Sequence, residues 1–303
     1  MDISFIIVNW NTKDLLIECL ASIYQTVNEI DFEIWVVDNG SSDGSVEAIK
    51  EKYPHIKIIE NQTNLGFAAA NNLALERMCG YYALLLNTDT VLTKDAVTEL
   101  HNFMQGNPEA AIACGQLLNP DGSKQNSIAH FPSLLSLVSN ETLLRLLLPR
   151  RFPSKRREYR TPIEIDSCIG ACMLIRKKAI DEIGFLDDRY FFFLEETDWA
   201  YRIKKAGWKI FFVPAARIFH AQGKSVSVRA DARIMFYRSR YLFFRKWNLG
   251  PYPLACFVIF SRLLINTALS LLGVAFTLGL KKGLNRRLIV YAQLIVWHMK
   301  GCP

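Results

Sequence analysis

Apolar runs of strand length alternate with amphipathic helical patterns over the first third of the chain. The runs are Ile3–Val8, Phe32–Val37, Ile56–Ile59 and Tyr81–Leu86. Around them, apolar residues recur at helical spacing, as over residues 15–24 and 96–104. Alternation of this kind predicts right-handed βαβ units and a mostly parallel sheet covered by helices on both faces. The predicted fold class is therefore α/β.

Polar and acidic residues follow the ends of these runs. Asn87-Thr88-Asp89 comes directly after the fourth run, Asn9 after the first and Asp38 after the second. In open α/β sheets, ligands bind just outside the carboxyl ends of the strands. A carboxylate at that edge can bind a divalent cation that carries the phosphates of a substrate. Each such turn is ordinary by itself, but three such turns on strands of one predicted sheet indicate a ligand site.

A further turn contains mostly small residues, from Asn64-Leu65-Gly66-Phe67 through three alanines to Asn71 and Asn72. Small residues let a backbone approach a ligand closely, and the start of a helix suits an anion. The sequence therefore predicts a phosphate-side loop here, with an ordinary turn as the alternative.

Three carboxylates, Glu195, Glu196 and Asp198, follow the aromatic run 191–193 and open a helical stretch. Acids in a first helical turn are favoured by the macrodipole, so helix capping is one explanation. Capping does not explain the aromatic run, which supplies a water-poor wall that can raise the pKa of a carboxylate toward a general-base role. At helical spacing Glu195 and Asp198 share a face, whereas Glu196 points elsewhere.

The C-terminal part changes character. Residues 253–280 are overwhelmingly apolar, and a second apolar run covers 288–299, with Lys281, Lys282, Arg286 and Arg287 between them. A spanning helix needs about 20 apolar residues; by this measure 263–280 is just short and 288–299 is too short. We therefore expect helices that lie in the cytoplasmic interface of a membrane. A buried hairpin or a true span are the alternatives.

The formal net charge of +7 and the pI near 9.0 favour an anionic partner, such as a nucleotide or an acidic membrane surface. Basic residues gather at 150–160 and in the C-terminal region rather than along one helix, which argues against nucleic acid. The 150–160 cluster is either a solvated loop or a flap near phosphates or anionic lipid. The seven cysteines are scattered along the chain, which favours reduced thiols in the core. The first residues also lack the basic region of a signal peptide. We therefore expect a cytosolic setting.

Together the motifs resemble the inverting nucleotide-sugar glycosyltransferases of family 2, which have the GT-A fold, and especially their rhamnosyltransferase-like branch. The resemblance covers roughly residues 2–245. It implies a GT-A type nucleotide-binding sandwich at 1–245, with a nucleotide half at about 1–115 and an acceptor half at about 116–245. The apolar and basic helical region at 246–303 is expected to be membrane-associated. The motifs that carry the resemblance are Val8–Asn11, Val36–Gly44, Asn64–Phe67, Leu85–Thr90, Gly170–Arg176 and Glu195–Trp199.

The resemblance also implies a nucleotide and metal site. Asp38 would hold the base or ribose with Asn9 nearby, and Asp89 would bind Mg²⁺ or Mn²⁺ on the diphosphate. His220 matches a histidine that completes the metal site in some members, with a purely structural histidine as the alternative. The residues expected to line the nucleotide pocket are Asn64, Gly66, Asn72 and Asn87, the last replacing the first acid of the stricter Asp-x-Asp motif.

In the acceptor half, Glu196 aligns with the proposed catalytic base of the family, with Glu195 and Asp198 as alternates. The residues expected to shape the acceptor pocket are Gly170, Ala171 and Trp199. The implied reaction moves rhamnose or a similar hexose from a nucleotide-diphosphate sugar to a saccharide or polyprenyl-diphosphate-linked saccharide, at the cytoplasmic membrane face. The alternative is a catalytically silent nucleotide-sugar-binding scaffold on the same fold. A nucleotidyltransferase is disfavoured, because no glycine-rich, lysine-bearing loop follows the first strand.

Overall fold

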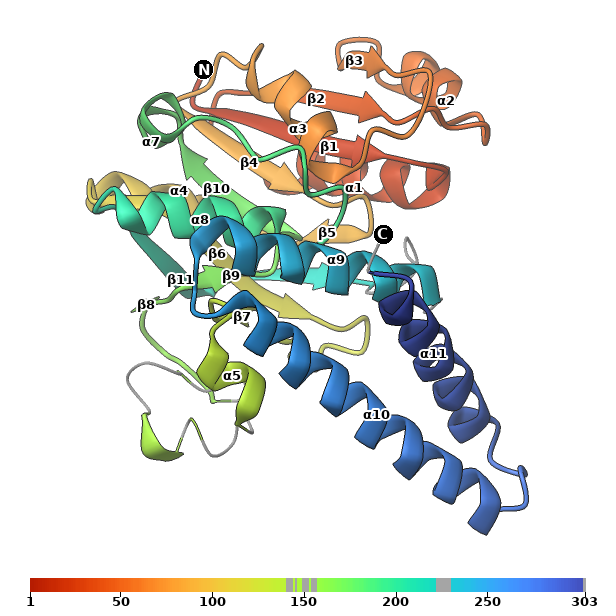
Figure 1. Ribbon diagram of the computed structural model, residues 1–303. Helices are drawn as coiled ribbons and strands as arrows, with labels where there is room; N and C mark the ends of the chain where they lie inside the picture. Colours follow the sequence, from red (N-terminus) through yellow and green to blue (C-terminus); the bar gives the residue numbers. More distant parts are fainter. Residues whose placement is uncertain (140–143, 145, 149–152, 154–156, 222–229, 302–303) are drawn as a thin grey trace. The chain divides into compact units, whose positions relative to one another are not determined.

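The computed structural model describes residues 1–139, 144, 146–148, 153, 157–221 and 230–301 (Figure 1). The chain divides into two compact units. The first comprises residues 1–131 and 153–225, and the second comprises 132–152 and 226–303.

The first unit is built on a nine-stranded mixed sheet with the order β3-β2-β1-β4-β10-β6-β11-β5, and β8 pairs with β11. The first four strands and the β6–β11 pair are parallel, which confirms the predicted mostly parallel α/β sheet. Strands β10, β5 and β8 run antiparallel to their neighbours. The strands are β1 (Ile3–Asn9), β2 (Phe32–Asp38), β3 (Lys57–Glu60), β4 (Tyr82–Leu86), β5 (Thr90–Leu92), β6 (Ala110–Leu118), β8 (Ile163–Glu164), β10 (Cys172–Arg176) and β11 (Lys209–His220); β7 (Ile128–Ala129) and β9 (Ser167–Cys168) form a separate pair.

Two apolar clusters cover the two faces of this sheet. Alternate residues of one strand belong to different clusters, as Phe5 and Ile7 do on one side and Ile6 on the other, because side chains alternate across a strand. Helices α1 and α4 contribute to the first cluster, and α3, α7 and α8 to the second. The helices of this unit are α1 (Lys13–Thr26), α2 (Ser45–Lys52), α3 (Phe67–Leu75), α4 (Ala96–Gly106), α7 (Lys177–Ile183) and α8 (Glu195–Lys205).

The second unit is helical, with α5 (Leu134–Val138), α9 (Ala230–Trp247), α10 (Tyr252–Phe276) and α11 (Lys282–Met299). Its core joins Ile259 and Leu263 of α10 to Leu294 and Trp297 of α11. Helices α10 and α11 follow one another as a hairpin (Figure 1). The rest of α10 is largely uncovered, with Ile265, Leu269, Leu271 and Leu272 each more than half exposed.

The length of α10 corrects the sequence-based expectation. The helix has 25 residues, and among the described helices it alone is long and apolar enough to cross a membrane. It begins at Tyr252 and accepts Pro253 in its first turn, because the N–H that proline lacks would have no intrahelical partner there. Arg262 does not interrupt it, since its guanidinium donates to the backbone carbonyl of Leu137. The apolar run is therefore not too short to span.

Candidate active site

Asp89 and His220 meet at the carboxyl edge of the sheet. Asp89 follows β4, and His220 is the last residue of β11, where it pairs with Thr90 of β5. Asp89 Oδ1 lies 3.3 Å from His220 Nε2, and the backbone N–H of Ala221 donates to the Asp89 carbonyl at 2.8 Å. Both side chains are buried. Antiparallel pairing of β5 with β11 therefore joins two residues that are far apart in sequence.

Gln125 orients the imidazole of His220. Its Oε1 lies 2.9 Å from His220 Nδ1, and its Nε2 donates to the His220 carbonyl at 2.5 Å. Because Oε1 can only accept, Nδ1 carries a hydrogen, and Nε2, the ring nitrogen that faces Asp89, is the atom left to bind a metal. Sequence reasoning missed Gln125, which follows an Asn-Pro-Asp-Gly turn and belongs to no motif.

The pair fits a divalent cation. Asp89 Oδ1 is buried without a hydrogen-bond partner among the described residues, and a carboxylate facing an imidazole lone pair offers two metal donors. Across the described chain no three or more His, Cys, Asp or Glu side chains gather as a metal site. Two protein ligands suit Mg²⁺ or Mn²⁺ when phosphate oxygens and waters complete the shell.

The turn Gly170–Ala171 connects the metal pair to the carboxylate cluster. The Asn87 backbone N–H donates to the Ala171 carbonyl at 3.0 Å. A Cβ added at Gly170 would lie 3.6 Å from Glu196 Cγ, so Glu196 lies directly against this turn. The predicted acceptor turn and the predicted base are thus adjacent.

Glu196 has the properties of a general base. Its side chain is partly exposed at the start of α8, and burial raises its pKa to about 6, while the Thr197 hydroxyl donates to it at 3.2 Å. Glu195 is buried, and its burial, together with the neighbouring Glu196 charge, raises the pKa of its carboxyl well above the ordinary range. At neutral pH Glu196 is therefore the ionised member of the pair.

Asp198, expected as an alternate base, lies inside the fold. It is fully buried and accepts hydrogen bonds from the Tyr190 hydroxyl at 3.3 Å and from Arg202 Nε at 3.1 Å. A carboxylate held in a buried ion pair cannot take a proton from an acceptor without breaking that pair. Asp198 therefore anchors α8 against the loop before it.

Trp199, expected to shape the acceptor pocket, also lies inside the fold. Its ring is fully buried in the apolar cluster beneath α8, and its indole N–H donates to the Gly184 carbonyl at 2.8 Å. It has no surface left for an acceptor. The expectation arose because Trp199 adjoins the acidic motif in sequence, whereas the helical turn carries it to the sheet side.

Asn9 and Asp38 stand side by side at the ends of the parallel strands β1 and β2. Asn9 Nδ2 donates to Asp38 Oδ1, and the backbone N–H of Ser41 donates to Oδ2, both at 2.8 Å. Asp38 is buried and holds the turn after β2. Each oxygen keeps a second lone pair, so a contact with ribose or base stays a prediction.

Asn64, Gly66 and Asn72 shape the loop into α3 and its contact with the segment before α8. Asn64 Oδ1 accepts from the Gly66 N–H at 2.9 Å. Asn72 exchanges two hydrogen bonds with the backbone of Leu186, at 2.9 and 3.0 Å. The close approach that Gly66 permits is by Phe191, whose carbonyl would lie 2.5 Å from a Cβ at Gly66. Nucleotide contacts of these residues stay predictions. The structure shows a link between this loop and the segment that precedes α8.

Comparisons with known proteins agree with this geometry. The family model described as glycosyl transferase family 2 matches residues 4–184. The N-acetylglucosaminyl-diphospho-decaprenol L-rhamnosyltransferase of Mycobacterium tuberculosis is 27% identical over 233 residues, which are 72% of this chain and 76% of the relative. The low-salt glycan biosynthesis hexosyltransferase Agl10 of Haloferax volcanii is 27% identical over 67% of this chain and 62% of its own length.

Solved structures show the same fold. A mannosyltransferase of Pyrobaculum calidifontis, in complex with GDP-Man and Mn²⁺, superposes with a TM-score of 0.61 at 18% identity and covers 98% of this chain and 87% of its own. GalNAc-T7 with UDP, GalNAc and Mn²⁺ gives 0.58 at 16% identity, over 83% and 52% of the two chains. The chain therefore belongs to glycosyl transferase family 2 and is a glycosyltransferase with a GT-A fold.

Proposed function

We propose that the protein transfers rhamnose or a similar hexose from a nucleotide-diphosphate sugar to a saccharide acceptor, with inversion of the anomeric carbon. One observation carries the proposal: the Gly170–Ala171 turn contacts Glu196 on one side and hydrogen-bonds the Asn87–Asp89 motif on the other. This arrangement supports a proton acceptor and a diphosphate anchor on the two sides of one turn.

On the donor side, Asp89 and His220 would hold Mg²⁺ or Mn²⁺, which when bound neutralises charge on the departing diphosphate. Gln125 keeps the His220 lone pair directed at that position. Asn9 and Asp38, at the ends of neighbouring strands, would receive the base or ribose. The rhamnosyltransferase of M. tuberculosis supports rhamnose as the leading sugar.

On the acceptor side, the Glu196 carboxylate takes the proton of the attacking hydroxyl. A base with a pKa of about 6 is ionised at neutral pH and close to the optimum for proton transfer. The hydroxyl oxygen attacks the anomeric carbon from the face opposite the diphosphate, so one displacement inverts the configuration. Asp198 and Arg202 keep α8 in register for this step.

The α10–α11 hairpin supports work at the cytoplasmic face of a membrane. Its apolar side chains are exposed, and Lys281, Lys282, Arg286 and Arg287 lie in and just after the turn between the helices. If α10 spanned the bilayer, these charges would lie on the far side from a cytoplasmic catalytic unit, against the positive-inside tendency. A hairpin lying in the interface places them at anionic headgroups instead. The acceptor would then be a polyprenyl-diphosphate-linked saccharide, as in the name of the M. tuberculosis relative.

The test incubates the purified chain with a panel of nucleotide sugars, with and without Mn²⁺, and follows nucleotide release. We expect Asp89→Ala to lose at least about a hundredfold in turnover, because the diphosphate charge is left uncompensated. Asp95→Ala, which removes an exposed carboxylate at the start of α4, is the matched control. Unchanged turnover in Asp89→Ala would refute the metal–diphosphate role, and nucleotide binding without transfer to any acceptor would favour the silent scaffold.

A further inference from the structure

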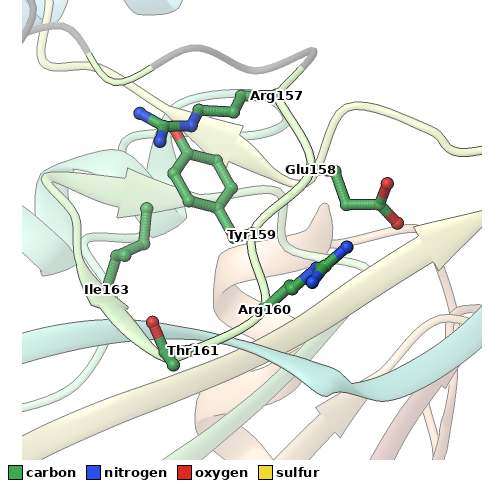
Figure 2. A pocket seen from close by; sticks show the side chains of 6 residues that line it. All are labelled: Arg157, Glu158, Tyr159, Arg160, Thr161 and Ile163. Carbon is green, nitrogen blue, oxygen red and sulfur yellow. The ribbon is translucent and has the colours of Figure 1, made fainter.

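A pocket of about 540 Å³ lies on the loop that leads into β8, and none of its lining residues belongs to the candidate active site. The lining side chains are Arg157, Glu158, Tyr159, Arg160, Thr161 and Ile163 (Figure 2). Two of them come from the basic cluster that the sequence placed at 150–160; residues 150–152 and 154–156 of that cluster lie outside the described chain.

Tyr159 gives this pocket a rigid base. Its ring packs edge-on against Phe212 of β11, with the centroids 6.0 Å apart. The guanidinium of Arg157 lies over the Tyr159 ring, 5.8 Å from its centroid, as Figure 2 shows. Arg157 is therefore held by the sheet through an aromatic contact, and less side-chain entropy remains to be lost when a ligand binds.

The positive charge of the pocket is in excess. Glu158, its one carboxylate, pairs with Lys124 at 2.8 Å and points away from the Tyr159 ring (Figure 2). Lys124 holds the pKa of Glu158 below its usual range, and Arg160 and Arg217 act in the same direction. Glu164, the next carboxylate along the chain, pairs with Lys204 at 2.7 Å. Arg157 and Arg160 have no ion-pair partner among the described residues, so their charge is available to an anion.

The chemistry of the lining selects among anions. Guanidinium groups present parallel N–H donors that match phosphate oxygens, and the Thr161 hydroxyl adds a further donor. The pocket is linked to the loop of Gln125 through one ion pair, because Glu158 pairs with Lys124, the residue before Gln125 in the chain.

We propose that this pocket binds the phosphate groups of a diphosphate-linked acceptor, with Arg157 and Arg160 as the principal contacts. This inference rests on the proposed function and adds to it a second phosphate site, separate from the donor site at Asp89 and His220. It gives a role to two arginines of this loop that form no salt bridge with any carboxylate among the described residues.

The test measures binding by the full chain in EDTA, which suppresses phosphate binding at the metal pair. The probes are farnesyl diphosphate, inorganic pyrophosphate and vesicles of phosphatidylglycerol, which represent a lipid-linked diphosphate, a free diphosphate and a headgroup phosphodiester. Arg157→Gln/Arg160→Gln is compared with Lys52→Gln/Lys178→Gln, which removes two exposed charges elsewhere in the first unit. Arg157→Lys/Arg160→Lys keeps the charge but removes the paired donors.

We expect Arg157→Gln/Arg160→Gln to weaken the binding of both diphosphates roughly tenfold or more. Arg157→Lys/Arg160→Lys should bind them with an affinity between those of this variant and the wild type. The control Lys52→Gln/Lys178→Gln should bind them as the wild type does. Loss of vesicle binding alone would overturn the proposal in favour of a headgroup site, and unchanged binding of all three probes would overturn it outright. Donor turnover is measured separately. Its absence in the wild type would defeat the proposed function, whereas pyrophosphate binding would still report on the pocket.

Discussion

Gly66→Ala tests the contact between the loop into α3 and the segment before α8. Gly66 has φ +85° and ψ 174°, a conformation open essentially only to glycine, and a residue with a side chain pays about 1–3 kcal/mol for it. The added Cβ would also meet the Phe191 carbonyl at 2.5 Å and its ring at 2.8 Å. The backbone must therefore shift, at the expense of the 2.9 Å hydrogen bond from the Phe67 N–H to Phe191, a further loss of about 1 kcal/mol.

We expect a total destabilisation of about 2–4 kcal/mol and a fall in turnover, because the Phe191 segment leads directly into Glu196. Gly122→Ala is the matched control: Gly122 also has a positive φ, +80°, but its Cβ would meet nothing within 4 Å, so only about 1–2 kcal/mol of backbone strain is expected. The assay is urea unfolding followed by circular dichroism, together with nucleotide release at saturating donor. Equal destabilisation of the two variants, with normal turnover in Gly66→Ala, would refute the contact as described.

Three further predictions concern the base, its anchor and the hairpin. Turnover should fall below about pH 6, because protonation removes the base as the pH drops through the pKa of Glu196. Glu196→Gln should lower turnover about 10²–10⁴-fold and abolish this fall at acid pH. If the pH–rate profile of the variant still falls at acid pH, another group is the base. Asp198→Asn should cost about 3 kcal/mol in urea unfolding, because it removes the buried carboxylate that pairs with the partly buried Arg202. If Asp198 is not the base, the folded variant should keep turnover within about tenfold of the wild type. Changing Lys281, Lys282, Arg286 and Arg287 to Gln should weaken the affinity for phosphatidylglycerol vesicles in a flotation assay roughly a hundredfold or more at low salt, at about 1 kcal/mol per charge. Nucleotide-sugar hydrolysis should be unchanged. Equal flotation of the variant and the wild type would show that the hairpin binds without these charges.

The positions of the early strands along the chain were predictable, because each of the four apolar runs is local and bounded by turn residues. All four became strands at nearly their expected bounds, and the polar residues that follow them, Asn9, Asp38 and Asp89, lie at one sheet edge as parallel pairing requires. The opposed orientation of Glu195 and Glu196 also followed from helical spacing alone, since Glu195 is buried and Glu196 partly exposed.

Local pattern could not separate residues that share a motif but face different surroundings. Glu196, Asp198 and Trp199 are neighbours in sequence, yet one lies against the Gly170 turn, one in a buried ion pair and one in the apolar core. The extent of α10 was missed because the apolar run was counted from the residue after Arg262, whereas the Leu137 carbonyl accommodates that arginine within the helix.

From the sequence alone came the α/β class, the carboxyl-edge site and the resemblance to family 2, all of which depend on short-range periodicity and on motif order. Only the tertiary structure decided that Gln125 orients His220 toward Asp89, that Glu196 lies partly exposed against the Gly170 turn, and that Gly66 makes room for Phe191. Each of these depends on a contact between segments that are distant in the chain. Such contacts are set by strand pairing and packing, which no local pattern encodes.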